Sequence, residues 1–317
     1  MREQSDKVIP VVRATSHGPA VLTAARPQSL WRTCWRRFCR HRLALAGMTV
    51  LLVLTLGTLV GPLVYHRHLN DIDFAVSLQG PSLTPPLGTD DLGQDLLARI
   101  LYGGRVSMAV GLMAMLIAML FGTAIGATAG YCGGWVDHVL MRLTDLFISL
   151  PQLPLLLLVV YLFRDTMRRL FNPELGIFLL IVLVIGGLRW MQPARLVRAA
   201  FLSLKEQEFV EAAVALGTPP LRMILRHILP NALSPVIVAA SLGVGSAILA
   251  ESSLSFLGLG FPPDMPTWSR LLFDAKDHLD SAPHWALFPG TMIFLVVLSI
   301  NYVGDGLRDA LDARKVL

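Results

Sequence analysis

Long apolar runs alternate with short charged segments along most of this chain. Six runs reach roughly the 18 residues that a membrane-spanning helix needs. They lie at residues 43–64, 107–129, 144–163, 176–193, 233–250 and 286–304. Pro151 and Pro154 interrupt the third run and Pro193 ends the fourth, so we expect these two to be irregular. The pattern predicts an all-α membrane protein with six transmembrane helices.

The polar segments divide the chain further. Residues 1–28 mix Pro, Gly, Ser and charge without periodicity, which predicts a flexible cytoplasmic tail. Residues 29–42 interleave aromatic and arginine side chains at helical spacing, which predicts an amphipathic helix at the membrane surface. The same interleaving suits nucleic acid, but the adjoining span favours lipid. Residues 43–106 then hold the first span and an outer loop, and residues 107–317 a core of five spans.

Acidic residues gather late in the outer loop 65–106. Thr89 or Asp90 is expected to cap a helix there, because Asp90, Asp91 and Asp95 suit a positive helix N-terminus. Calcium binding is the alternative, since carboxylates are its preferred ligands. The cluster lacks the spacing and the glycine of a calcium loop. Helix capping is therefore the preferred interpretation, and no metal site is expected.

The segment 195–232 is a charged loop between the fourth and fifth spans. Its pattern predicts a helix from Leu196 to Leu216, which Gly217 ends in the left-handed conformation. Thr218 is expected to cap a second helix. Pro230 is expected to end that helix just before the fifth span. The sequence therefore predicts a folded, bent loop rather than a simple connection.

Composition agrees with a membrane protein. Of 317 residues, 54% are hydrophobic and 15% are charged, whereas soluble domains carry about 25% charged residues. Mean hydropathy is +0.60. The net charge of +5 does not indicate nucleic acid as a partner, because the basic residues crowd against the spans and suit membrane lipid.

The placement of Lys and Arg predicts the topology. With a cytoplasmic N-terminus, 18 of the 27 Lys and Arg residues lie in inner segments and 8 in outer ones, which favours both termini inside. The first span has 22 apolar residues, more than the roughly 7–15 of a cleaved signal core. We therefore expect an uncleaved anchor, and we expect segment 195–232 to lie in the cytoplasm.

Motifs for catalysis are missing from the sequence. None of the four lysines follows a glycine, so the chain has no P-loop. It also lacks a zinc-protease motif, a complete dinucleotide-binding motif and a serine nucleophile elbow. We expect neither catalytic residues nor a cofactor bound by this chain.

Ionisable residues in or beside spans are candidates for a translocation path. They are Asp145, Arg189 and Glu251. The alternative for each is a structural pair across a helix contact. Arg142 and Asp145, for example, stand three residues apart.

The segment from Glu211 to Pro230 resembles the EAA motif in permease subunits of ABC importers. That motif reads Glu-Ala-Ala, three residues, Gly, nine residues and Ile-x-Leu-Pro. Residues that fit it are Glu211, Ala212, Ala213, Gly217, Leu229 and Pro230, and His227 stands where Ile is usual. The His-Ile-Leu-Pro-Asn form is similar to the dipeptide/oligopeptide/nickel branch. Residues 88–95, 130–145, 255–260 and 304–312 resemble the C-type permease of that branch.

This resemblance implies an ABC importer type I transmembrane domain in the inner membrane. It implies a homologous B-type permease, two ATPase subunits that hold ATP and Mg²⁺, and an extracytoplasmic substrate-binding protein. A coupling helix would lie within residues 209–218, and Thr218 joins the motif residues as a coupling candidate. The substrate stays open among dipeptides, oligopeptides, nickel and other small solutes.

Two other functions compete with the importer permease. A stand-alone secondary transporter would suit six spans with ionisable residues, but the halves show no convincing inverted repeat. An intramembrane enzyme would need a catalytic constellation that the sequence lacks. The permease interpretation is preferred because it alone accounts for the bent inner loop.

Overall fold

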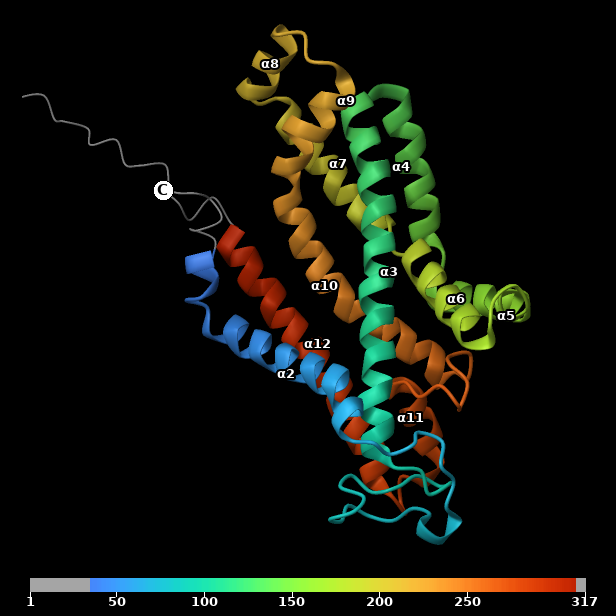
Figure 1. The fold of residues 1–317 in the computed structure, drawn as a ribbon. Helices are drawn as coiled ribbons and strands as arrows, with labels where there is room; N and C mark the ends of the chain where they lie inside the picture. Colours follow the sequence, from blue (N-terminus) through green and yellow to red (C-terminus); the bar gives the residue numbers. More distant parts are fainter. Residues whose placement is uncertain (1–34, 312–317) are drawn as a thin grey trace, which may run out of the picture.

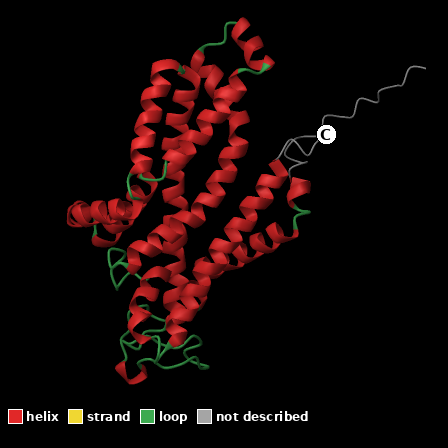
Figure 2. Cartoon of the chain, turned by 180° about the vertical axis from the view of Figure 1, so that it is seen from behind, coloured by secondary structure: helices red, strands yellow, loops and turns green. Residues whose placement is uncertain are grey.

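The computed structural model describes residues 35–311, which form a bundle of helices without a β-strand in that range (Figures 1 and 2). The long helices are α2 (Arg42–Val64), α3 (Leu96–Cys132), α4 (Gly134–Ser149), α5 (Gln152–Leu170), α6 (Pro173–Gly187), α7 (Met191–Lys205), α10 (Leu229–Phe256) and α12 (Pro283–Leu311). Shorter elements are η1 (Phe74–Val76), α8 (Glu208–Ala215), α9 (Pro220–Arg222), the π-helical turn η2 (Met223–Ile228), α11 (Trp268–Ala275) and η3 (Lys276–His278). The predicted tail 1–28 lies outside the described residues.

The predicted spans are present as helices. Four helices are long and apolar enough to cross a membrane by themselves, and the count reaches six if each of two bent pairs forms one span. The bent pairs are α4 with α5, at 88°, and α6 with α7, at 43°. The all-α, six-span prediction is therefore confirmed.

Helix α3 runs through the centre of the bundle and packs against α2, α6, α7 and α10 (Figure 1). Its contact with α7 is close because three glycines face that helix. A Cβ atom built on Gly126 would lie 2.3 Å from the Ala194 carbonyl oxygen, and one on Gly122 would lie 2.6 Å from Pro193 Cβ. The small residues therefore serve packing within the chain.

The third predicted span is not one straight helix. Helix α4 ends at Ser149, and Pro151 is the N-cap of α5. Because proline disfavours helical geometry in the residue before it and lacks an N–H, the chain turns sharply there. The second span differs as well: α3 begins at Leu96, so the expected boundary at residue 107 falls inside this helix.

The acidic residues of the loop before α3, predicted to be an outer loop, act differently from the prediction. Asp95, rather than Thr89 or Asp90, caps α3, and its carboxylate accepts a hydrogen bond from the Ala98 N–H at 3.1 Å. Asp90 instead accepts bonds from the Leu92 and Gln94 N–H groups and closes a turn within the loop.

The segment 195–232 contains one more break than predicted. The expected helix from Leu196 to Leu216 is divided, with α7 ending at Lys205 and α8 beginning at Glu208. The break places Glu208 and Glu211 in the first turn of a new helix, where free N–H groups favour negative charge. It also turns α8 back toward η2.

Only part of the predicted interfacial helix 29–42 is described. Residues 35–38 form one helical turn. Phe38 is buried and packs with Ala44 and Ala310, whereas Trp35 is exposed. Within the described part, this turn is therefore attached to α2 and α12 as well as presented outward.

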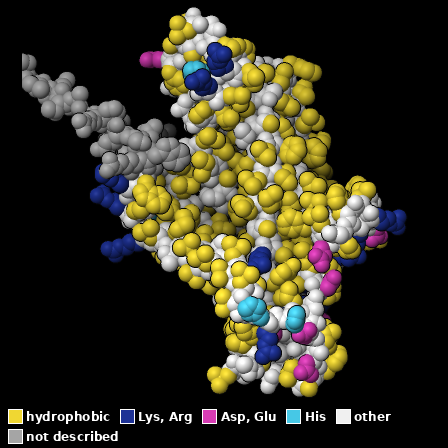
Figure 3. Space-filling view, in the orientation of Figure 1, with side chains coloured by type: hydrophobic (Ala, Val, Ile, Leu, Met, Phe, Trp, Pro, Cys, Tyr) yellow, Lys and Arg dark blue, Asp and Glu magenta, His cyan; other side chains and the backbone are white. Residues whose placement is uncertain are grey.

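Hydrophobic side chains cover most of the bundle surface in Figure 3, and charged groups gather near its ends and on α5. Helix α2 alone exposes Leu52, Val53, Leu56, Leu59 and Leu63 by about half or more. A surface of this kind suits lipid or another membrane subunit.

Candidate coupling segment and transmembrane cavity

Residues 206–230, here called the coupling segment, form a folded tip at one end of the bundle (Figure 1). The inner side of α8 buries Val210 and Ala213, which pack in one cluster with Met223 and Ile228. Burial of these side chains holds the short helix in place, since eight residues are too few for a stable isolated helix.

The outer side of the same segment is apolar and exposed. Leu216 is 86% exposed, and Val214 and Leu221 exceed 60%. Such a cluster at the tip of a connecting loop is typical of a protein-binding surface. The coupling segment therefore exposes apolar side chains on α8, directly after α8 and on α9.

Gly217 sets the direction of the chain after α8. Its φ is +75°, in the predicted left-handed region. The Gly217 N–H donates to the Val214 carbonyl at 2.9 Å, and the Thr218 N–H donates to the Ala213 carbonyl at 3.1 Å. These two bonds form a Schellman motif, which closes the helix end. Thr218 therefore completes this C-terminal cap, whereas Pro219, rather than Thr218, is the N-cap of α9.

Pro230 does not end a helix, contrary to the prediction. The chain stays helical from Pro220 to Phe256, and the missing N–H is accommodated by the π-helical turn. There the Leu229 N–H donates to the Ile224 carbonyl, five residues back. The Asn231 side-chain amide donates to the His227 carbonyl at 2.6 Å. The proline therefore marks an altered helical register at the end of the coupling segment.

The remaining motif residues lie on α8 with opposite exposures. Glu211 and Ala212 are exposed, whereas Ala213 is buried. The Glu211 carboxylate has no ion pair or hydrogen bond with any residue from 35 to 311. It is therefore available to a group outside this chain.

Two ion pairs connect α4 to α7. Asp145 pairs with Arg195 rather than with Arg142, and Asp137 accepts from Arg198, with one Nη2–Oδ2 distance of 2.6 Å. Sequence reasoning did not identify the two arginines. Their spacing of three residues on α7 places both on one helix face, but nothing in the sequence indicates that α4 lies opposite.

Glu251 is fully buried inside the chain. Hydroxyl groups of Ser255, Thr267 and Ser269 donate to its carboxylate at 2.8, 3.3 and 2.6 Å. The last two residues belong to the start of α11, so the carboxylate ties α10 to that short helix. Glu251 does not line the cavity described next.

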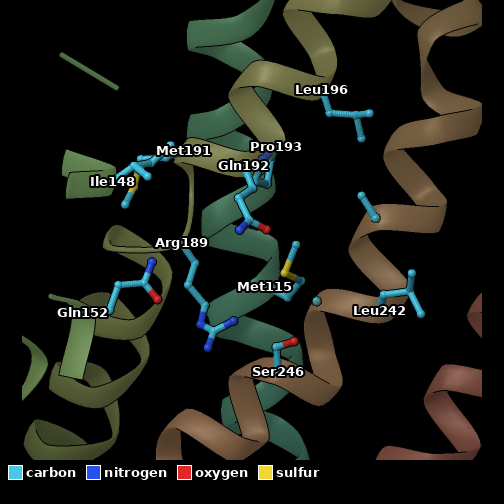
Figure 4. A pocket seen from close by; sticks show the side chains of 12 residues that line it. Met115, Ile148, Gln152, Arg189, Met191, Gln192, Pro193, Leu196, Leu242 and Ser246 are labelled. Atoms are coloured by element: carbon cyan, nitrogen blue, oxygen red, sulfur yellow. The ribbon is translucent and has the colours of Figure 1, made fainter. Parts of the chain in front are cut away.

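Arg189 lies in the bend between α6 and α7 and points into a cavity of about 420 Å³ (Figure 4). The cavity is lined by Met115, Ile148, Gln152, Arg189, Met191, Gln192, Pro193, Leu196, Ala239, Leu242, Gly243 and Ser246. It is therefore enclosed by residues of α3, α4, α5, α7 and α10. Of the three residues suggested for a path, Arg189 alone borders this space.

A second cavity of about 670 Å³, at the end of the bundle opposite the coupling segment, is lined by Asp90 and Asp274 among other residues. Burial raises the pKa of Asp90 to about 6, although Arg99, 3.3 Å away, acts in the opposite direction. Burial also raises the pKa of Asp274. No three His, Cys, Asp or Glu side chains in residues 35–311 converge as metal ligands would.

Family models match most of the chain. Residues 122–316 match the inner membrane component of binding-protein-dependent transport systems, and residues 29–86 match the N-terminal transmembrane domain of oligopeptide transport permease C. The first match includes the coupling segment and the cavity bend. The second includes α2.

Individual relatives cover nearly the whole chain. A dipeptide transport system permease of Alkalihalophilus pseudofirmus is 39% identical over 92% of this chain and 91% of its own length. A glutathione transport system permease of Pectobacterium atrosepticum is 38% identical over 93% of this chain and 96% of its own length. An oligopeptide transport system permease of Escherichia coli is 39% identical over 90% of this chain and 92% of its own length.

The resemblance drawn from the EAA pattern is thus confirmed across the chain, including its assignment to the C-type branch. The helical bundle and its membrane spans agree with an inner-membrane, multi-pass protein. The chain belongs to the family of inner-membrane components of binding-protein-dependent transport systems and is a permease subunit of an ABC importer.

Proposed function

We propose that this permease forms, with a homologous B-type permease, the membrane path for peptides and takes its energy from two separate ATPase subunits. The exposed apolar side chains of the coupling segment carry the proposal. A helix held rigidly on its inner side and uncovered on its outer side is suited to transmit movement of a docked subunit. ATP and Mg²⁺ would bind to the ATPase subunits.

Glu211 and the Gly217 turn would orient the coupling helix. The Glu211 carboxylate, which has no partner in residues 35–311, offers a charge to the ATPase surface, and Ala212 beside it permits close approach. Gly217, Thr218, Leu229 and Pro230 would maintain the angle between α8 and α10. In this arrangement the coupling segment lies in the cytoplasm together with both termini.

Peptides are the proposed substrate class because three relatives transport compounds of this kind by name: dipeptides, oligopeptides and glutathione. An extracytoplasmic binding protein would deliver the peptide at the end of the bundle that carries residues 66–95. Nickel and other small solutes are the alternatives that an uptake assay would reveal.

Charge reversal at Glu211 tests the coupling role. In the complete transporter reconstituted into proteoliposomes, Glu211→Arg should reduce ATP-driven uptake by about tenfold or more, because it places a positive charge where an ion pair is expected. Glu174→Arg is the matched control, since Glu174 is an exposed first-turn glutamate on α6. Its uptake should stay unchanged.

Three results would contradict the proposal. One is full uptake by Glu211→Arg, and another is purification of the tagged chain without an ATPase subunit. The third is uptake that follows an ion gradient without ATP, which would instead support a secondary transporter.

A further inference from the structure

The cavity beside the α6–α7 bend combines one positive charge with neutral groups. Its lining includes Arg189, but no Asp, Glu or Lys. Two amides, Gln152 and Gln192, and the Ser246 hydroxyl supply the other polar side chains. A cavity with this composition favours a negatively charged ligand over a cation.

The Arg189 guanidinium has no partner among the described residues. No ion pair or hydrogen bond joins it to another side chain in residues 35–311. Met115 and Leu242 line the same cavity. A charge placed beside apolar side chains without a counter-charge is costly. Ionisable groups within membrane spans commonly mark a substrate pathway.

Neighbouring arginines differ in this respect. Arg195 and Arg198 lie on α7, after the bend that holds Arg189, and pair with Asp145 and Asp137 respectively. Arg164 donates to the Gly260 carbonyl at 3.1 Å. Arg189 lacks a partner in residues 35–311 and lines the cavity, where an incoming group can reach it.

We propose that Arg189 binds the carboxylate of the transported peptide while the peptide crosses this cavity. The proposal rests on the proposed function, because it identifies the group that a peptide would present. A planar guanidinium can form two parallel hydrogen bonds with a carboxylate. Gln152, Gln192 and Ser246 add adaptable donors and acceptors beside it (Figure 4).

The cavity dimensions agree with a small ligand. About 420 Å³ lies within the roughly 300–1,000 Å³ typical of small-molecule sites. The cavity is bounded by the bend at Leu188–Trp190, which separates α6 from α7. A relative movement of these two helices would displace Arg189 with respect to Gln152 and Ser246. The bound carboxylate would then be released as the permease changes state.

Uptake of tri-alanine tests the proposal directly. In proteoliposomes containing the complete transporter, Arg189→Gln should lower uptake of tri-alanine at limiting concentration by about 10- to 100-fold, as expected for loss of a charged hydrogen bond. Arg189→Lys should restore part of it. Arg169→Gln, which removes an exposed arginine of α5, should have no effect. Uptake of tri-alanine amide, which lacks the carboxylate, should be insensitive to Arg189→Gln.

A labelling experiment tests the same charge without transport. Ser246→Cys would be introduced into a complete transporter whose Cys34, Cys39 and Cys132 are serine. The ratio of reaction rates with an anionic and a cationic methanethiosulfonate reagent measures the local potential, and thiolate reactivity cancels in this ratio. Adding Arg189→Gln should lower the ratio by about tenfold. Adding Arg169→Gln should leave it unchanged.

The outcomes separate this proposal from the proposed function. Absence of ATP-driven peptide uptake by the unmodified complex would contradict the proposed function. Normal uptake in the unmodified complex with no loss in Arg189→Gln would contradict the role of Arg189 alone. Two further results would contradict the role of Arg189: an equal loss of uptake for tri-alanine and its amide, and an unchanged labelling ratio. Either would indicate that Arg189 does not meet the peptide carboxylate and instead pairs with an acidic residue of the partner permease.

Discussion

Glu251 shows how a buried carboxylate can serve structure. It occupies the interior of α10 and is surrounded by hydroxyl donors from α10 and α11. A buried carboxyl group is retained when several hydrogen bonds compensate for the lost water. Glu251 therefore fixes α11, and with it the end of the bundle opposite the coupling segment, against the long helix α10 (Figure 1).

Two substitutions distinguish a structural from a path-lining role. Glu251→Gln keeps the shape of the side chain and one acceptor oxygen, so we expect the free energy of unfolding to fall by about 1 kcal/mol. Glu251→Ala leaves three hydroxyls without their acceptor and opens a cavity, so we expect the free energy of unfolding to fall by about 3 kcal/mol. Thermal unfolding of the purified complex measures both. Unchanged stability with lost uptake would instead assign Glu251 to the path.

Asp90 predicts a pH dependence at the outer loop. Its folded pKa of about 6 exceeds its ordinary value of 3.8, so between these values the folded chain retains a proton that the unfolded chain has released. The stabilisation from this proton is complete below pH 3.8 and is lost as pH rises through 6. Asp90→Asn does not titrate. The unfolding temperature of the unmodified protein, relative to that of Asp90→Asn, should therefore rise from pH 7.5 to pH 5.

An unchanged difference in unfolding temperature between pH 7.5 and pH 5 would show that Asp90 titrates normally. The comparison with Asp90→Asn is necessary because Asp274 also has a raised pKa. Both aspartates interact with Arg99, so the comparison is repeated in an Asp274→Asn background, which removes the contribution of Asp274.

At the scale of elements, the contact between α3 and α7 determines how the bundle packs. A Cβ on Gly126 would lie 2.3 Å from a backbone oxygen of α7 and 2.9 Å from Val197 Cβ. Neither atom is at the flexible end of a side chain. The two helices would have to separate, which would also move the Arg198–Asp137 pair.

Gly126→Ala should therefore destabilise the protein by about 2–3 kcal/mol, as overpacking does. Gly57→Ala is the matched control, because Gly57 lies within α2 and has no atom within 4 Å of a built Cβ. Removing a helical glycine there should be neutral or stabilise by up to about 1 kcal/mol. Denaturation of both variants in the same detergent measures the contrast. Equal effects would show that α3 and α7 do not pack through Gly126.

Element positions follow well from hydropathy, but bends and partners do not. Six apolar runs identify the spans because burial in lipid requires apolar side chains at each position. The bend at Pro151 is indicated locally, yet its angle depends on packing between α5 and α6. The partner of Asp145 is determined by the position of α7, so Arg195, and not the nearby Arg142, pairs with it. The Gly217 turn was predictable because its geometry is local.

Over the whole molecule, the long helices connect two chemically different ends. The coupling segment exposes Leu216 at one end, and the loop 66–95 exposes Leu83 at the other. The distribution of Lys and Arg predicts that the first end is cytoplasmic. This orientation decides whether α8 can meet an ATPase at all.

Single cysteines test that orientation. In a variant whose native cysteines are serine, Leu83→Cys should react with a membrane-impermeant maleimide in intact spheroplasts, because Leu83 is 97% exposed. Leu216→Cys, at 86% exposure, should react only after the membrane is permeabilised. Both side chains are open to solvent in the chain itself, and the cells used lack the ATPase subunits that would cover Leu216. A difference in labelling therefore reports the side of the membrane rather than burial. The reverse pattern would place the coupling segment outside and would contradict its role as the ATPase contact.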